Sequence, residues 1–387
     1  MRAAPWLRTP ALAVVLATAA AIGLRLVAMQ SAIAPARDAL RYLHAAKTLP
    51  ELKLTDWLQL IDAHPLYPAA LWAGHAAYVA AGAEDGPWAW IRAGQWIGIA
   101  SQVCWLLAAY SIGARLWSPR TAFLGCLLTA LLPRTIWYSA DLLADSLHAA
   151  LWTTSLALLV GGWRNGSRSA FLGAGLTAGL AYLTRVEALQ LPATALAAGT
   201  LALLSPGTNR KRLATGLALF AAGWAATGGP YVAAIGRLSV KNSAAAFTGA
   251  PTRSEPVDEL ATPTNGALAE RTIAGAAMTL LAEFSQETRG WPLPFALLGL
   301  AVALRRGKPK AGWTPAAVAF VGGCAMLALL WQRAGFMAGR LLLPLMPFAL
   351  FAAAAGLEST GRGLVRTVLA AWPPHAIRRS ALGGAAW

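Results

Sequence analysis

The chain is built from long apolar runs separated by segments that alternate in charge. Ten runs consist mostly of Ala, Leu, Val, Gly and Trp, and most reach or approach the roughly 20 residues that span a hydrocarbon core. This pattern predicts an all-α fold, a polytopic integral membrane protein with about ten transmembrane helices. The runs cover residues 9–30, 88–113, 121–138, 146–162, 170–184, 188–204, 213–232, 291–304, 314–331 and 341–357.

Every second segment between these runs is short and cationic. Together they hold 17 Lys and Arg and a single acid, Glu358, whereas the other side holds 15 basic and 15 acidic residues. The formal net charge of +16 therefore lies wholly on one side, which the positive-inside rule makes cytoplasmic. We expect a protein of the inner or plasma membrane with both termini in the cytoplasm. Its chemistry should then lie on the extracytoplasmic side.

Two external segments, residues 31–87 and 233–290, are longer than ordinary loops. Within the first, residues 66–83 are apolar enough to be read as a span, but a span there would place the later basic clusters outside. We therefore expect a helix lying at the outer face. With no internal repeat detectable, residues 1–357 are predicted to form one transmembrane domain and residues 358–387 a disordered cytoplasmic tail.

The composition excludes several classes of protein. With 57% hydrophobic and 12% charged residues, against about 25% charged in soluble domains, the chain is not an ordinary globular protein. Its basic residues flank spans instead of forming one groove-sized patch, so no nucleic acid is expected as a partner. The absence of a Gly-rich phosphate cradle and of an Asp-x-Asp tripeptide argues against direct use of a nucleotide sugar.

Four polar motifs follow one another along the predicted external face. An Asp comes shortly after the first run and is followed by an amphipathic helix and a His-Pro-Leu-Tyr element. The next three motifs are an acidic element, a Thr-Arg-x-Glu segment and an Arg-Leu-Leu-Leu-Pro run. Their residues are Asp38 with His64-Pro65-Leu66-Tyr67, then Asp141 to Asp145, Thr184-Arg185-Val186-Glu187 and Arg340 to Pro344.

In this order the motifs resemble the polyprenyl-phosphate-dependent membrane glycosyltransferases of the C superfamily. The likeness is to family 39 and related branches, which include protein O-mannosyltransferases and the lipid A aminoarabinose transferase, and it covers about residues 10–357. It implies transfer of a sugar from a lipid-linked donor in the membrane to a cell-envelope acceptor, which could be protein, lipid or glycan. Two departures stand out: Val186 replaces the usual Pro, and Pro65 is single where a double Pro is usual.

The chemistry of such a transfer needs a base for the proton of the acceptor and cations for the phosphate that leaves. Asp38 is the candidate catalytic base, and in-line attack opposite the phosphate predicts inversion at the anomeric carbon. The apolar tail of the donor can stay among the membrane lipids. The candidate substrate-binding residues are Asp62, His64, Asp145, Arg185, Glu187, Lys241 and Arg340.

Each candidate also has a purely structural interpretation. The Asp residues can pair with neighbouring Arg residues or lie at helix N-termini, Arg185 and Glu187 can pair with each other, and Arg340 can be a snorkelling anchor. Asp62 and His64 could bind a divalent metal, but no third ligand is apparent, so metal dependence is open.

Three other classes of function compete with the glycosyltransferase. A secondary transporter would show charged residues or broken helices near the centres of its spans and an internal repeat, and neither is evident. A polymerase or ligase of lipid-linked polysaccharide would use related chemistry. A non-catalytic scaffold would not need the clustered external acids.

Overall fold

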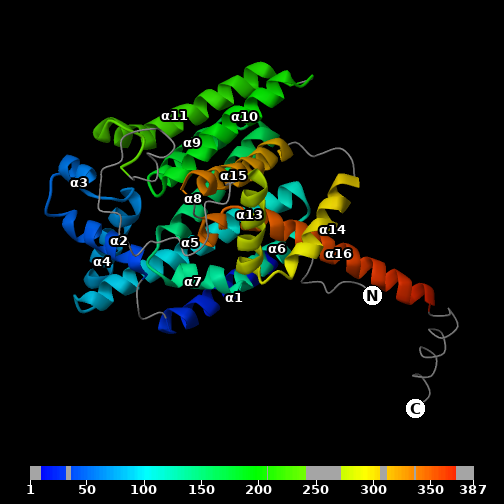
Figure 1. The fold of residues 1–387 in the computed structure, drawn as a ribbon, viewed down its shortest axis with the longest axis horizontal. Helices are drawn as coiled ribbons and strands as arrows, with labels where there is room; N and C mark the ends of the chain where they lie inside the picture. The colour runs from blue at the N-terminus through cyan, green and yellow to red at the C-terminus, as the bar shows by residue number, and fades with distance from the viewer. Residues whose placement is uncertain are drawn as a thin grey trace, which may run out of the picture.

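The computed structural model is a bundle of helices (Figure 1). It describes residues 10–31, 36–206, 208–240, 272–305, 312–334 and 337–371, and within these ranges every regular element is a helix. The predicted all-α class is therefore confirmed. The helices that coincide with the predicted apolar runs are α1 (Pro10–Ser31), α5 (Pro87–Leu116), α6 (Pro119–Leu131), α7 (Pro133–Ala140), α8 (Ala144–Asn165), α9 (Arg168–Tyr182), α10 (Gln190–Leu204), α11 (Arg210–Ile235), α14 (Pro292–Arg305), α15 (Trp313–Ala334) and α16 (Met346–Ala371).

Each of the ten predicted runs overlaps one of these helices. Among the described residues, four helices are long and apolar enough to cross a membrane, and the bent pair of α6 and α7 makes a fifth if it counts as one span. The chain is thus a multi-pass membrane protein by length and composition, while the count of ten spans stays a prediction. The remaining elements are α2 (Arg37–Thr48), α3 (Leu54–Leu60), α4 (Leu66–Ala80), η2 (Val186–Leu189), α13 (Ile273–Thr288) and η4 (Gly339–Leu342).

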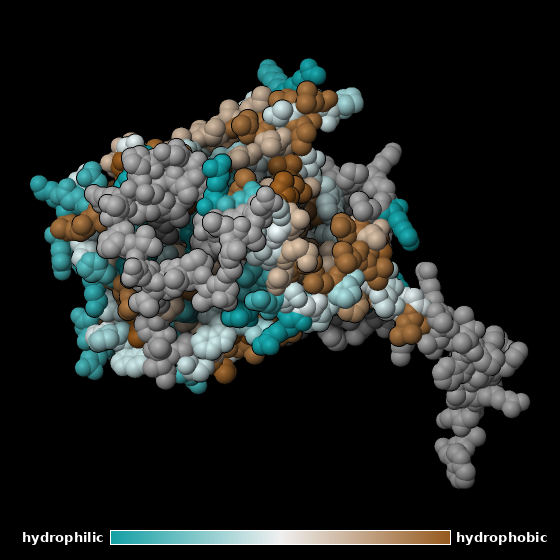
Figure 2. Space-filling model, in the orientation of Figure 1, coloured by the Kyte–Doolittle hydropathy of each residue, from teal (hydrophilic) through white to brown (hydrophobic). Residues whose placement is uncertain are grey.

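The bundle has two polar ends with different chemistry. At one end the predicted cytoplasmic basic residues meet, because Arg164 donates to the carbonyl oxygen of Arg115 over 2.8 Å and Arg212 donates to that of Asn165. Figure 2 shows apolar surface over α11 and α14, with polar residues over α2 and α3 and at the far end of α11. Three of the predicted cytoplasmic basic segments therefore lie together at one end of the bundle. Which end faces the cytoplasm stays a prediction.

The first external segment forms short helices at the end opposite these basic residues. Helix α4 has 15 residues, so it is about 22 Å long, shorter than the roughly 30 Å of a hydrocarbon core. Its first amide, that of Leu66, donates to the carbonyl oxygen of Leu183 over 2.8 Å. This contact fixes the start of α4 on the turn between α9 and η2. Because α9 and α10 also have 15 residues, length alone does not place α4, and its position at the membrane face stays a prediction.

Helices α6 and α7 are bent by 62° at a break before Pro133. Proline has no N–H to donate, so carbonyl groups near the break need other donors. The Thr135 hydroxyl donates to the carbonyl oxygen of Leu132 over 2.8 Å, and the fully buried guanidinium of Arg25 donates to that of Ala130 over 3.4 Å. A broken helix within a membrane needs such internal partners. The segment after the bend, α7, carries Trp137 and Tyr138.

Small residues allow the long helices to approach closely. A Cβ atom on Gly175 of α9 would lie 2.0 Å from the carbonyl oxygen of Phe220 on α11, and one on Gly299 of α14 would lie 1.8 Å from that of Ala352 on α16. Such contacts are the usual basis of helix association in membranes, where burial of apolar surface supplies no driving force.

The predicted start of the disordered tail requires correction. Helix α16 continues to Ala371, so residues 358–371 are helical. The carboxylate of Glu358 lies 3.8 Å from Arg362, one turn later, and 3.8 Å from Arg120 on α6. These charge pairs support the helix beyond the predicted boundary. The remainder of the predicted tail lies outside the described residues.

Candidate active site

Four segments that are far apart in the sequence meet at the end of the bundle that carries α2. They are the first turn of α2, the first turn of α8, the turn between α9 and η2, and the 3₁₀ helix η4. Their charged residues are in contact although some of them are as many as 302 positions apart in the sequence. The segments contribute Asp38, Asp145, Arg185 with Glu187, and Arg340 respectively.

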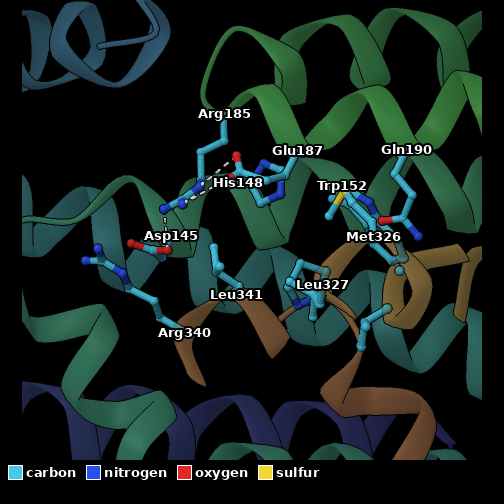
Figure 3. Close-up of a pocket in the computed structure, with 13 residues that line it drawn as sticks. Asp145, His148, Trp152, Arg185, Glu187, Gln190, Met326, Leu327, Arg340 and Leu341 are labelled. Carbon is cyan, nitrogen blue, oxygen red and sulfur yellow. Dashed lines mark hydrogen bonds and ion pairs between the residues drawn. The ribbon is translucent and has the colours of Figure 1, made fainter. Parts of the chain in front are cut away.

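Arg185 is held between two carboxylates. Its Nη1 atom donates to Oδ1 of Asp145 over 2.6 Å and its Nη2 atom to Oε1 of Glu187 over 3.0 Å (Figure 3). Burial alone would lower the pKa of Arg185, but the two carboxylates outweigh it and raise the pKa well above its ordinary value. The side chain is only 9% exposed. Arg185 is therefore a permanently charged centre that fixes both acids.

Arg340 forms the second ion pair. Its Nη2 atom lies 2.5 Å from Oδ2 of Asp38, and the two side chains are 27% and 37% exposed. Burial lowers the pKa of Arg340, but the carboxylates of Asp145 and Asp38 raise it above its ordinary value. Because both partners reach the surface, this pair is open to exchange with another anion, unlike the buried group around Arg185.

A narrow cavity begins at these charges and continues between helices. Figure 3 shows Arg185, Asp145 and Arg340 at one end and Gln190, Met326 and Trp152 at the other, with Leu327 and Leu341 between them. Its interior volume is about 20 Å³, room for about one water molecule. A larger group can enter only if side chains such as that of Arg340 move. The cavity thus joins a charged mouth to an apolar interior.

Sequence reasoning missed two aromatic residues beside this charged group. His148 lines the cavity, with its Nδ1 atom 3.3 Å from the Thr184 hydroxyl. Tyr42 packs edge-on against Tyr67 with ring centroids 5.0 Å apart, and burial raises the pKa of Tyr42 to about 12, so its hydroxyl keeps its proton. Both could have been found from spacing, because they follow Asp145 by three residues and Asp38 by four, on the same helical faces.

Two predicted site residues do not join this group. Asp62 is half exposed and lies 3.5 Å from Arg41. His64 is fully buried, where its Nε2 atom lies 3.0 Å from the Ser239 hydroxyl beside the ring of Tyr182. Lys241 lies outside the described residues. Neither Asp62 nor His64 lines the cavity beside Arg340.

The described part of the chain contains no group of three His, Cys, Asp or Glu side chains that could hold a metal ion. Asp62 and His64, the residues considered as metal ligands, differ in their surroundings, since one is half exposed and the other fully buried.

Known proteins resemble this chain in sequence over part of its length. Residues 91–227 match the model of the dolichyl-phosphate-mannose-protein mannosyltransferase family. None of the curated proteins matches the chain significantly. The family match covers most of α5, all of α6 to α10 and most of α11, but it does not reach Asp38 or Arg340.

Solved membrane enzymes resemble the chain in fold. ArnT from Cupriavidus metallidurans matches with a TM-score of 0.61 at 16% identity, covering 92% of this chain and 62% of that protein. The same protein bound to undecaprenyl phosphate matches with a TM-score of 0.61 at 15% identity, covering 92% and 63%. The Archaeoglobus fulgidus oligosaccharyltransferase matches with a TM-score of 0.58 at 15% identity, covering 93% and 51%.

The chain thus spans less than two thirds of the length of these proteins. The fold likeness and the family match together confirm the resemblance to the membrane glycosyltransferases of the C superfamily that the four motifs indicated.

Proposed function

We propose that this protein is a membrane glycosyltransferase that moves a sugar from a polyprenyl-phosphate donor to a hydroxyl of an extracytoplasmic acceptor. The observation that carries the proposal is the partly exposed ion pair of Arg340 with Asp38, in which Arg340 also lines a cavity with an apolar interior. Such a site suits a substrate with an anionic head and a hydrocarbon tail. The match to the mannosyltransferase family and the fold likeness to ArnT bound to undecaprenyl phosphate support it.

The donor phosphate would bind to Arg340. A guanidinium can form two parallel hydrogen bonds to a phosphate, and the side chain of Arg340 is accessible. The phosphate then competes with the carboxylate of Asp38 for the same Nη atoms. Binding of the donor would therefore release Asp38 from its ion pair, at the moment when a base is needed.

The released carboxylate would accept the proton of the acceptor hydroxyl. As that oxygen bonds to the anomeric carbon, the bond from this carbon to the phosphate oxygen breaks, and the phosphate leaves as an anion held by Arg340. Attack opposite the leaving phosphate inverts the configuration at the anomeric carbon. No strong acid is needed, because a lipid phosphate is already a stable leaving group.

Asp145 would hold the transferred sugar. Its Oδ1 atom is bound by Arg185, while its Oδ2 atom is buried without a hydrogen-bond partner among the described residues. A buried acceptor atom without a donor costs free energy, and a sugar hydroxyl can supply the donor. Glu187 and Arg185 are positioning residues in this scheme, because they fix Asp145 through the buried ion pairs.

Substitution of Arg340 tests the proposed donor site. In membranes supplied with labelled polyprenyl-phosphate sugars and cell-envelope acceptors, Arg340→Ala should weaken use of the donor far more than use of the acceptor. Arg340→Lys should recover only part, because Lys lacks the planar fork. Arg237→Ala, which removes an exposed arginine at the end of α11, is the matched control. Equal loss against both substrates would refute the phosphate-binding role.

We also propose that the charged site faces the extracytoplasmic side and that both termini lie in the cytoplasm. The support is the positive-inside rule together with the convergence of Arg115, Arg164 and Arg212 at the opposite end of the bundle. Cysteines introduced near residues 45 and 145 should react with an impermeant reagent added to intact cells. Labelling of a cysteine near residue 118 from outside would contradict this orientation.

A further inference from the structure

A second, larger cavity lies between α7 and the C-terminal end of α13. It has an internal volume of about 490 Å³, within the range of about 300–1,000 Å³ that is usual for ligand sites. It is therefore far roomier than the narrow cavity beside Arg340. Its lining residues are Pro133, Arg134, Trp137, Gln286, Glu287 and Arg289.

The lining of this cavity favours an anion with an apolar face. Arg134 and Arg289 are both exposed in it, and neither has an ion-pair partner among the described residues. The ring of Trp137 is 54% exposed. Guanidinium groups bind phosphate and carboxylate in the same fork geometry, and an exposed indole offers a flat apolar surface beside a polar edge. A sugar that carries an acidic group presents both features.

Glu287 separates this cavity from the charged site. It is 4% exposed, and its Oε1 atom accepts a hydrogen bond of 3.0 Å from the Tyr138 hydroxyl, while its Oε2 atom has no such partner in the described structure. Burial raises the pKa of Glu287, although Tyr138 and Arg134 lower it. Two arginines line the cavity against this one carboxylate, so the balance of charge there is positive.

The same carboxylate contacts the segment that carries Arg340. A Cβ atom placed on Gly339 would lie 2.1 Å from Oε1 of Glu287, so a larger residue there would displace this side chain. Arg340 follows directly and pairs with Asp38. The larger cavity is therefore connected to Arg340 through Glu287, which lines it, and through Gly339, which precedes Arg340 in the chain.

We propose that this cavity binds the acceptor, and that the acceptor is a saccharide bearing a phosphate or carboxylate group. The acidic group binds to Arg134 and Arg289, and the sugar ring lies on Trp137. The Oε2 atom of Glu287 is then available to a sugar hydroxyl. This inference deepens the proposed glycosyl transfer, because it assigns a chemical class to the acceptor of that reaction.

Direct binding tests the inference without any need for transfer. Calorimetric titration of the purified full-length protein should show that glucose 1-phosphate and glucuronic acid bind at least about tenfold more tightly than glucose, the ratio expected from one charge-assisted hydrogen bond. The double variant Arg134→Gln/Arg289→Gln should lose this preference. Arg340→Ala and the control Arg237→Ala should retain it, which distinguishes this cavity from the donor site.

Equal binding of glucose and the two anions, or unchanged anion binding by the double variant, would overturn the inference.

A glycolipid with a phosphorylated sugar head in nanodiscs serves as the membrane-borne probe. If this glycolipid binds more tightly than glucose 1-phosphate, the acceptor is a molecule held in the membrane. In transfer assays the double variant should raise the KM for the acceptor at unchanged KM for the donor. Binding that depends on Arg134 and Arg289 in a protein that transfers no sugar would refute the glycosyltransferase proposal while leaving this binding site in place.

Discussion

Two arginines of the charged site differ in how their charge is balanced. From this difference we infer that one arginine maintains the structure of the site and that the other takes part in the reaction. Arg185 is almost fully buried between Asp145 and Glu187, whereas Arg340 shares a half-exposed pair with Asp38. A buried pair can be broken only at high cost, while an accessible pair is held weakly. We infer that the first group is fixed throughout turnover and that the second exchanges partners with the donor.

The largest effect is expected from breaking the buried group. Arg185→Ala would leave two carboxylates without their cation in a site closed to solvent, and such a loss typically destabilises a protein by about 3–5 kcal/mol. Thermal unfolding of the purified variant should therefore occur well below that of the wild type, with reduced protein in membranes. A variant with wild-type unfolding temperature would show that this group is not the fixed half of the site.

The next largest effect is expected on transfer from the exchangeable pair. Asp38→Asn keeps the shape of the side chain but removes the base, so sugar transfer should fall by about 10²-fold or more. The variant should insert into membranes at normal levels, because the half-exposed pair contributes little to stability. Transfer is measured at matched protein level with a labelled polyprenyl-phosphate sugar. Near-normal turnover would move the search for the base to Asp145.

The smallest effect is expected from Asp62, which lies beside the site but outside its cavity. Its pair with Arg41 is exposed on both sides, and exposed pairs are worth about 0–1 kcal/mol. Asp62→Asn should therefore change transfer by less than about fivefold. A loss as large as that of Asp38→Asn, in the same assay, would show that the first external loop rearranges to bring Asp62 to the substrate.

The sequence predicted the helices better than the contacts between distant side chains. Apolar runs and charge alternation locate the helices, because lipid tolerates little else. The pairing of Asp38 with Arg340 joins positions 302 residues apart, and no local pattern encodes such a contact. The surroundings of His64 could not be predicted for a related reason. A polar residue within a loop motif can be buried against a distant hydroxyl, and here that hydroxyl belongs to Ser239.

Other features depend on tertiary contacts that have no sequence signature. The bend before Pro133 is stabilised by Arg25 of α1, and the extension of α16 depends partly on Arg120 of α6. Local spacing did carry unused information on Tyr42 and His148, which share helical faces with predicted site residues.

The central claim is that the donor phosphate replaces Asp38 on Arg340, and equilibrium binding of undecaprenyl phosphate tests it most directly. Removing the competing carboxylate should strengthen binding, so Asp38→Asn should bind this lipid more tightly than the wild type, although it transfers sugar poorly. Arg340→Ala should bind it more weakly. Weaker binding by Asp38→Asn, or unchanged binding by Arg340→Ala, would contradict the exchange.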